Sequence, residues 1–270
     1  MTPRPSRPVR LLASALTAGA LLITAACSDD GDGGSGSADV TGSPSADSPA
    51  AASGAALTEA GAQAALVTEA DLEDDWSKVT DAATWRDKLL VGTVDVADFL
   101  TAKADAADCQ KLLDSLHGED LLGKPSGASA LTGFEQGDSR LLYQVAAYDR
   151  AALDDSFTWL KSLPTECDSF TVTDGKDKRT VEVIETSLPE EGDARQGLRV
   201  TVRGTVDGAP TTLTLDVAAV RVGSDALTVT AGGLDGDESD STKQAAKLGT
   251  QRLKDVQAGK TPSADPGEQD

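Results

Sequence analysis

The chain has 270 residues, of which 45 are Asp or Glu and 24 are Lys or Arg, and its formal net charge is −21. This acidic excess argues against a protein that binds duplex nucleic acid, because phosphate binding needs a basic surface. The chain has one histidine and three cysteines, too few to favour a zinc site, whereas its 39% hydrophobic residues are enough for a folded core.

The N-terminus has the pattern of a secretory signal. Met1–Arg10 carries three arginines and no acid, and Leu11–Ala26 is apolar or small throughout. That stretch is shorter than the roughly 20 residues of a spanning helix, so it predicts a signal peptide over 1–26. The sequence Thr24-Ala25-Ala26-Cys27 resembles the lipobox of bacterial lipoproteins. The resemblance implies a diacylglyceryl group on Cys27; the alternative is an ordinary secretory signal with an incidental cysteine.

Two segments have the composition of disordered chain. Residues 27–56 are rich in Gly, Ser, Ala and Asp and contain no aromatic residue, and residues 259–270 are rich in Pro and acids. Neither segment can bury enough apolar surface to offset the entropy lost on ordering. We therefore expect a tether, a single globular domain over 57–258 and a tail.

The domain begins with helical signals. Thr58 and Thr68 are expected N-caps, and Thr68 with Asp71 forms a capping box. The apolar residues of 104–117 fall on one helical face, and Gly118 follows at the position of a C-terminal glycine.

Two strands and a helix are expected next. The strands lie near 129–135 and 140–148, and the second is apolar on both faces, which predicts a central position in the sheet. Asp149 is expected to cap a helix that runs to about Leu163 and is closed by Pro164.

From Phe170 onward the apolar residues alternate with polar ones. This pattern predicts antiparallel strands with one wet face, followed by a final helix from about Ser239 to Ala258. The order of elements predicts an α+β fold: a twisted antiparallel sheet with helices packed on one side. The expected inward residues are Phe170, Val172, Val181, Val183, Leu198, Val200, Val202, Leu213, Leu215, Val217, Leu227 and Val229.

Asp207-Gly208 lies between two alternating runs and suits a two-residue type I′ hairpin. Pairing about this turn places Arg199 opposite Asp216 and Thr201 opposite Thr214 on the wet side. A shift of one residue would mix the two faces, so burial excludes it.

The wet face of this hairpin bears Arg199, Arg203, Thr212 and Thr214. One interpretation is a solvated face. The other is the floor of a ligand-binding cleft, because two neighbouring arginines stand out on so acidic a protein.

Cys109 and Cys167 are an even pair in a domain expected outside the cell, which favours a disulfide. Two buried free thiols are the alternative. A redox-active pair is not favoured, because the chain has no Cys-x-x-Cys motif.

Three features carry a family resemblance: the string Leu66–Trp76, the helical Cys109, and Leu163-Pro-Thr-Glu-Cys167. They resemble a group of actinobacterial surface lipoproteins that is similar to the extracellular sensor domain of mycobacterial Ser/Thr protein kinases. The resemblance spans roughly 60–258 and implies a disulfide-stapled α+β domain with a ligand cleft. Those kinase sensors usually carry two disulfides, and this chain has cysteines for one.

Other candidate chemistry has simpler explanations. Gly137-Asp-Ser139 resembles a hydrolase block, but the single histidine, His117, lies upstream, and Gly137-Asp138 suits a hairpin turn. Asp235–Asp240 has some of the oxygen spacing of a calcium loop but lacks the glycine and the final glutamate of an EF-hand. Acids here also favour the start of the last helix. We expect no catalytic residue, no metal site and no cofactor.

These observations predict a non-enzymatic, lipid-anchored binding or sensing module at the extracytoplasmic face of the bacterial cell membrane. Its expected contacts are the membrane, through Cys27, and an unknown small ligand or envelope protein. The alternatives are an envelope scaffold without a small ligand and a carrier of lipid or glycolipid. A carrier needs an apolar cavity.

Overall fold

The computed structural model describes residues 56–263, apart from 73–75, 86–89, 92–93, 96–99, 101, 119, 175–176, 207 and 235. The predicted signal peptide, Cys27 and nearly all of the predicted tether lie outside the described residues. None of the described helices is long and apolar enough to cross a membrane.

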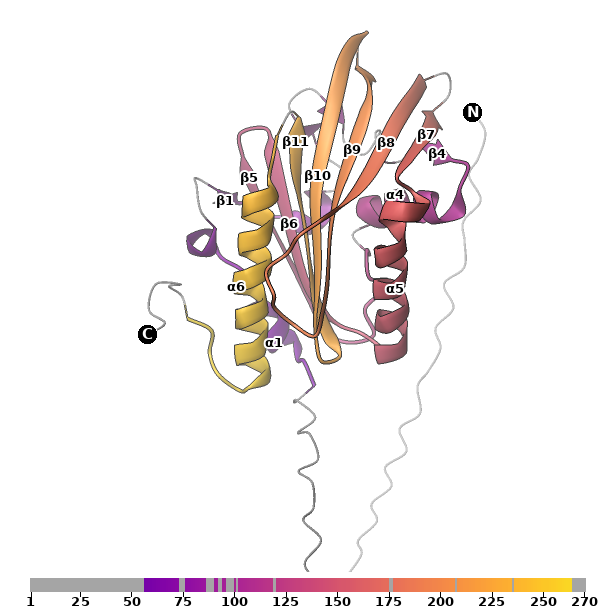
Figure 1. Ribbon diagram of the computed structural model, residues 1–270. Helices are drawn as coiled ribbons and strands as arrows, with labels where there is room; N and C mark the ends of the chain where they lie inside the picture. Colours follow the sequence, from indigo (N-terminus) through magenta and orange to yellow (C-terminus); the bar gives the residue numbers. More distant parts are fainter. Residues whose placement is uncertain are drawn as a thin grey trace, which may run out of the picture. The chain divides into compact units, whose positions relative to one another are not determined.

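The described residues form a nine-stranded antiparallel sheet and a separate two-stranded sheet, β2–β3 (Figure 1). The strand order in the large sheet is β1-β5-β6-β11-β10-β9-β8-β7-β4. The strands are β1 (Ser77–Lys78), β2 (Leu90–Val91), β3 (Val94–Asp95), β4 (Lys103–Ala104), β5 (Ser129–Gln136), β6 (Ser139–Ala147), β7 (Ser169–Asp174), β8 (Asp177–Thr186), β9 (Ala194–Val206), β10 (Ala209–Val222) and β11 (Asp225–Leu234). The helices are α1 (Glu59–Ala64), a 3₁₀ turn (Glu69–Asp71), α2 (Ala82–Trp85), α4 (Ala107–Gly118), α5 (Arg150–Glu166) and α6 (Ser239–Gln257). The predicted α+β class and antiparallel sheet are confirmed.

The hydrophobic core has two parts, one on each face of the sheet. Val200 of β9 belongs to the first part together with residues of α4 and α5. Val229 of β11 belongs to the second part together with residues of α1 and α6. The alternating residues of β10 are divided between the two, with Val217 in the first and Ala218 in the second.

The helices therefore cover both faces of the sheet, whereas the sequence placed them on one. Figure 1 shows α6 and α5 on two sides of the strands. The physical reason is that β10 and β11 are buried on both faces over much of their length, and an apolar strand face needs a packed layer. α6 packs on β10 and β11, and α5 packs on β8 and β9.

The expected caps of the first two helical segments are present. Thr58 Oγ1 accepts a hydrogen bond from the Gly61 N–H at 3.0 Å and begins α1. Thr68 and Asp71 form the capping box, which opens a single 3₁₀ turn. Residues 103–104, where the predicted 104–117 helix was to begin, belong instead to strand β4, and α4 starts at Ala107.

Cys109 of α4 and Cys167 after α5 form the predicted disulfide across a sequence separation of 58. Pro164 does not end α5, which runs to Glu166. A proline removes one helical N–H, but in the last turn few hydrogen bonds depend on it. The Cys167 N–H donates to the Leu163 carbonyl at 2.8 Å and holds this turn.

The register of the β9–β10 hairpin is as predicted. Thr201 pairs with Thr214 and Arg199 pairs with Asp216, while Val206 and Ala209 flank the two-residue turn. Gly208 has a φ of +80°, a conformation that glycine adopts without steric cost.

Candidate ligand-binding face

One face of strands β7 to β10 is left without a helix over most of its area, and we call it the open face. Successive side chains of a strand point to opposite faces, so the residues of this face follow from the register. On β7 and β8 they are Ser169, Thr171, Thr173, Lys178, Thr180, Glu182 and Ile184; on β9 and β10 they are Arg199, Thr201, Arg203, Thr205, Thr212 and Thr214. All are exposed or half-buried.

The four residues predicted as a ligand site lie together on this face. Arg203 stands directly opposite Thr212, and Thr214 stands opposite Thr201 in the same strand pair. Arg203 is also opposite Thr180 of β8. Neighbouring strands are about 4.8 Å apart, so these side chains form rows across the sheet. Their role in binding a ligand stays a prediction.

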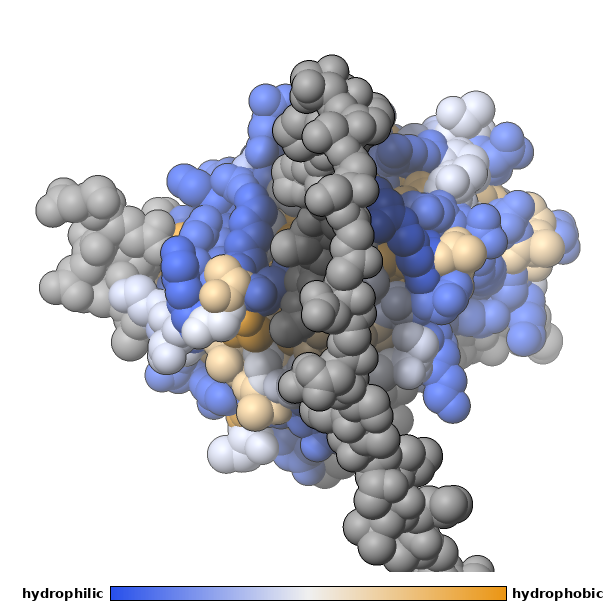
Figure 2. Space-filling model, turned by 90° about the horizontal axis from the view of Figure 1, so that it is seen from below, coloured by the Kyte–Doolittle hydropathy of each residue, from blue (hydrophilic) through white to orange (hydrophobic). Residues whose placement is uncertain are grey.

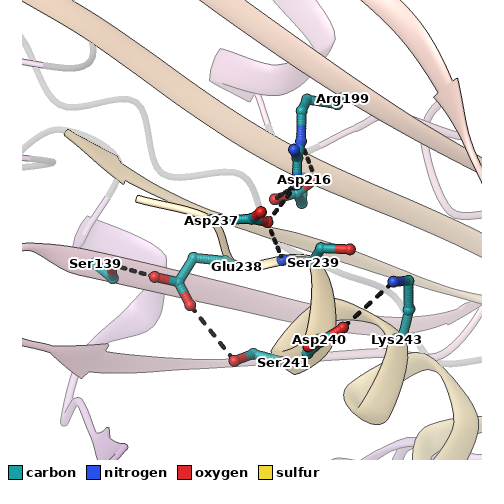
Figure 3. A network of polar contacts seen from close by, with 9 residues as sticks. All are labelled: Ser139, Arg199, Asp216, Asp237, Glu238, Ser239, Asp240, Ser241 and Lys243. Carbon is teal, nitrogen blue, oxygen red and sulfur yellow. Dashed lines mark hydrogen bonds and ion pairs between the residues drawn. The ribbon is translucent and has the colours of Figure 1, made fainter. Parts of the chain in front are cut away.

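Arg199 lies at the rim of the open face, where α6 begins (Figure 3). Its Nε donates to Asp216 Oδ1 at 2.8 Å and its Nη2 donates to Asp216 Oδ2 at 3.1 Å. Nη2 also donates to Asp237, whose carboxylate accepts from the Ser239 N–H at 3.2 Å. Arg199 thus connects β9, β10 and the first turn of α6.

The carboxylate of Asp216 is nearly enclosed, since its side chain is only 4% exposed. The hydrogen bond with Asp216 raises the pKa of Arg199 above its ordinary value, against the opposing effect of burial. The guanidinium therefore stays protonated, and its positive charge is balanced within the protein.

Arg203 makes a more open ion pair. Its Nη1 lies 2.8 Å from Glu182 Oε2, with side chains 55% and 44% exposed. Solvent-exposed pairs of this kind contribute about 0–1 kcal/mol to stability. Arg203 and Glu182 are therefore free to exchange partners at little energetic cost.

The predicted calcium segment borders the same rim, and its first residue, Asp235, lies outside the described residues. Glu238 accepts from Ser139 Oγ at 2.5 Å and from Ser241 Oγ at 3.4 Å. Asp240 pairs with Lys243 at 3.3 Å (Figure 3). In the part of the chain that the structure describes, no three His, Cys, Asp or Glu side chains are grouped closely enough to hold a metal ion.

Two hollows lie elsewhere on the surface. A polar groove of about 740 Å³ surrounds the end of β8 and the start of β9, lined in part by Lys161, Glu185 and Arg195. A second hollow of about 510 Å³ lies against α4, lined in part by Lys111 and Ser156. Neither lining includes the four predicted residues.

Sequence reasoning missed three members of this region. Glu182 and Ile184 were overlooked because only the β9–β10 pairing could be registered, through its tight turn. Asp237 was interpreted as a helix-capping acid alone. A search for acidic residues able to reach Arg199 would have found Asp216 but not Asp237, since 38 residues separate Arg199 from Asp237.

No protein family model matches the chain, and no curated protein matches it significantly. Among solved structures, the chain is similar to the extracellular domain of PknH from Mycobacterium tuberculosis. The two share 11% sequence identity at a TM-score of 0.38, and the match covers 75% of this chain and 97% of that one.

Proposed function

We propose that this protein is a non-enzymatic binding or sensing module, exported and held at the outer face of the cell membrane by a lipid on Cys27, and that the open face is its binding surface. The signal-like N-terminus and the Cys109–Cys167 disulfide support an extracytoplasmic location, because disulfides persist in oxidising compartments.

The observation that carries the proposal is the open face itself. Sheet faces are normally packed against another layer, and here β10 and β11 are. The neighbouring strands β7, β8 and β9 instead present Thr171, Thr180 and Arg203 to solvent. Figure 2 shows that hydrophilic side chains predominate on another view of the surface, in keeping with a solvated exterior. A broad, regular surface built on strands is a rigid platform for a ligand.

Site-specific photo-crosslinking in the protein's own cells tests this proposal. One variant carries a photoreactive side chain in place of Thr180, on the open face. The matched control carries it in place of Thr158, an exposed threonine of α5. We expect an adduct with an envelope component from position 180 and none, or far less, from position 158. Equal adducts from both positions, or none from either, would contradict a binding role for this face.

A further inference from the structure

We propose that the ligand of the open face is an uncharged glycan chain, which lies across the threonine rows of strands β7 to β10. This inference rests on the binding role proposed above and adds the chemical class of the ligand.

The first argument is charge. The cations and anions of the face and its rim cancel: Lys178, Arg199 and Arg203 are matched by Glu182, Asp216 and Asp237. This electrically balanced surface belongs to a chain whose net charge is −21. An anionic ligand would be repelled by the whole molecule and would find no unbalanced cation pair on the face.

Recruiting Arg199 to bind an anion would also be costly. It would strip Asp216, with its 4% exposed side chain, of its partner. A buried carboxylate without a partner loses its solvation without compensation, which is strongly unfavourable. An uncharged ligand leaves this pair intact.

The second argument is the density of hydroxyl groups. Thr171 on β7, Thr180 on β8 and Thr212 on β10 stand in one row with Arg203 of β9, and Thr201 and Thr214 belong to the next. Within the part of the chain that the structure describes, the hydroxyls of these threonines bond to no other residue. Each hydroxyl offers one donor and two acceptor positions, the same capacity as a sugar hydroxyl.

The third argument is the apolar contact that a sugar ring needs for its C–H groups. Ile184 is 45% exposed and is the large hydrophobic residue that stands out as exposed among the described residues. It lies on the open face directly opposite Arg199. The threonine methyl groups extend this aliphatic surface between the hydroxyls.

The fourth argument is shape, which favours a polymer over a small molecule. The α6 end of the face is bounded by the Arg199–Asp237 contact, but the β7 end is nearly open, since β4 covers only Val172 and Thr173. A chain of sugar rings can enter and leave such a surface without being enclosed. The face carries no aromatic residue on which rings could stack, so we expect weak single-site binding that is strengthened when many anchored copies engage one polymer.

The test is co-sedimentation of the full-length protein, in detergent micelles, with insoluble polysaccharides. The neutral probes are cellulose and chitin, and the anionic probe is cross-linked pectate. The test variant is Thr180→Val/Thr201→Val, which removes two hydroxyls and keeps the shape of the side chains. The matched control is Thr158→Val/Thr211→Val, whose positions lie off the open face.

We expect retention on a neutral polysaccharide that persists in about 1 M NaCl, because it depends on few charges. Losing two hydroxyl contacts should weaken retention about tenfold in the test variant, with the control variant unchanged. Equal retention of both variants, retention on pectate alone that salt abolishes, or no retention on either neutral polysaccharide would overturn the proposal.

The photo-crosslinked adduct separates the two levels of inference. An adduct from position 180 that glycosidases shorten supports the glycan. An adduct that glycosidases leave intact and proteases degrade would overturn the glycan proposal while the binding role of the face stands. The absence of any adduct specific to position 180 would remove the binding role itself.

Discussion

The phenolic oxygen of Tyr143 occupies the space beside Gly249 of α6: a Cβ added to Gly249 would lie 2.1 Å from it. Tyr143 is fully buried in β6, and its hydroxyl donates to the Ala65 carbonyl at 3.3 Å. Burial raises the pKa of Tyr143, so the hydroxyl stays protonated and able to donate. The absence of a side chain at position 249 lets α6 approach the sheet closely enough to cover this tyrosine.

Gly249→Ala should therefore destabilise the protein by about 1–3 kcal/mol, even though alanine favours a helix, because the added methyl group overpacks the core. Urea denaturation measures the change. Lys247→Ala, at an exposed position of the same helix, is the control and should change stability by less than about 0.5 kcal/mol. Adding Tyr143→Leu to Gly249→Ala should cost less than the sum of the two single changes. Simple additivity would show that the two residues are not in steric conflict.

Removal of the Cys109–Cys167 disulfide should lower the free energy of unfolding by about 4 kcal/mol, given a separation of 58 residues. The Cys109→Ser/Cys167→Ser variant compared with the oxidised protein by denaturation gives this value. In the oxidised protein, alkylation under denaturing, non-reducing conditions should label neither cysteine. Full labelling of both would refute the disulfide.

Arg199→Ala should destabilise the protein more than Arg203→Ala. The first change leaves the enclosed Asp216 carboxylate without its bidentate partner and should cost about 1–3 kcal/mol. The second change removes an exposed pair with Glu182 and should cost less than about 1 kcal/mol. The double change Arg199→Ala/Asp216→Ala should recover part of the loss, because no unpaired charge remains. Similar costs for the two single changes would contradict the enclosure of Asp216.

Asp225 should make stability fall as the pH rises above its ordinary pKa. Burial raises the pKa of its carboxyl above 3.8, and the hydrogen bond that Gln257 donates at 2.8 Å opposes this effect in part. Between the unfolded and folded pKa values the folded state binds more protons, so the Asp225 contribution is full below 3.8 and is lost through the folded pKa.

The difference in stability between Asp225→Asn and wild type should thus shift in favour of the variant across that range and then level off. Denaturation of both proteins at a series of pH values from acid to neutral gives the difference. A difference that does not change with pH would show that Asp225 titrates alike in both states.

Cys27→Ser should release the protein from the membrane or leave its signal uncleaved. The diacylglyceryl group requires the thiol, and the acidic surface supplies no other attraction to anionic lipid. Fractionation of cells expressing the variant, with Ser28→Ala as the control, tests the anchor. If the Cys27→Ser protein remains in the membrane fraction with a cleaved signal, the lipid-anchor proposal is wrong.

Local rules determined much of this protein before any coordinates were known. Asp207-Gly208 and the alternation of residues on either side were enough to place Arg199 opposite Asp216, because a two-residue turn admits one register that keeps the apolar residues on one face. The pairing of Cys109 with Cys167 followed from their number and their expected compartment. The caps at Thr58 and Thr68 followed from short-range hydrogen bonding.

The tertiary structure alone decided how the layers are arranged. The apolar residues on both faces of 140–148 indicated a buried strand, but which helix covers each face depends on packing between segments far apart in the chain. The same holds for the contact of Arg199 with Asp237 and for the place of Ile184 on the open face. Turns and caps are set by neighbours within a few residues, so their residues can be read in order. A binding face is assembled from strands that meet only in the folded sheet, where strand order and twist determine which side chains become neighbours.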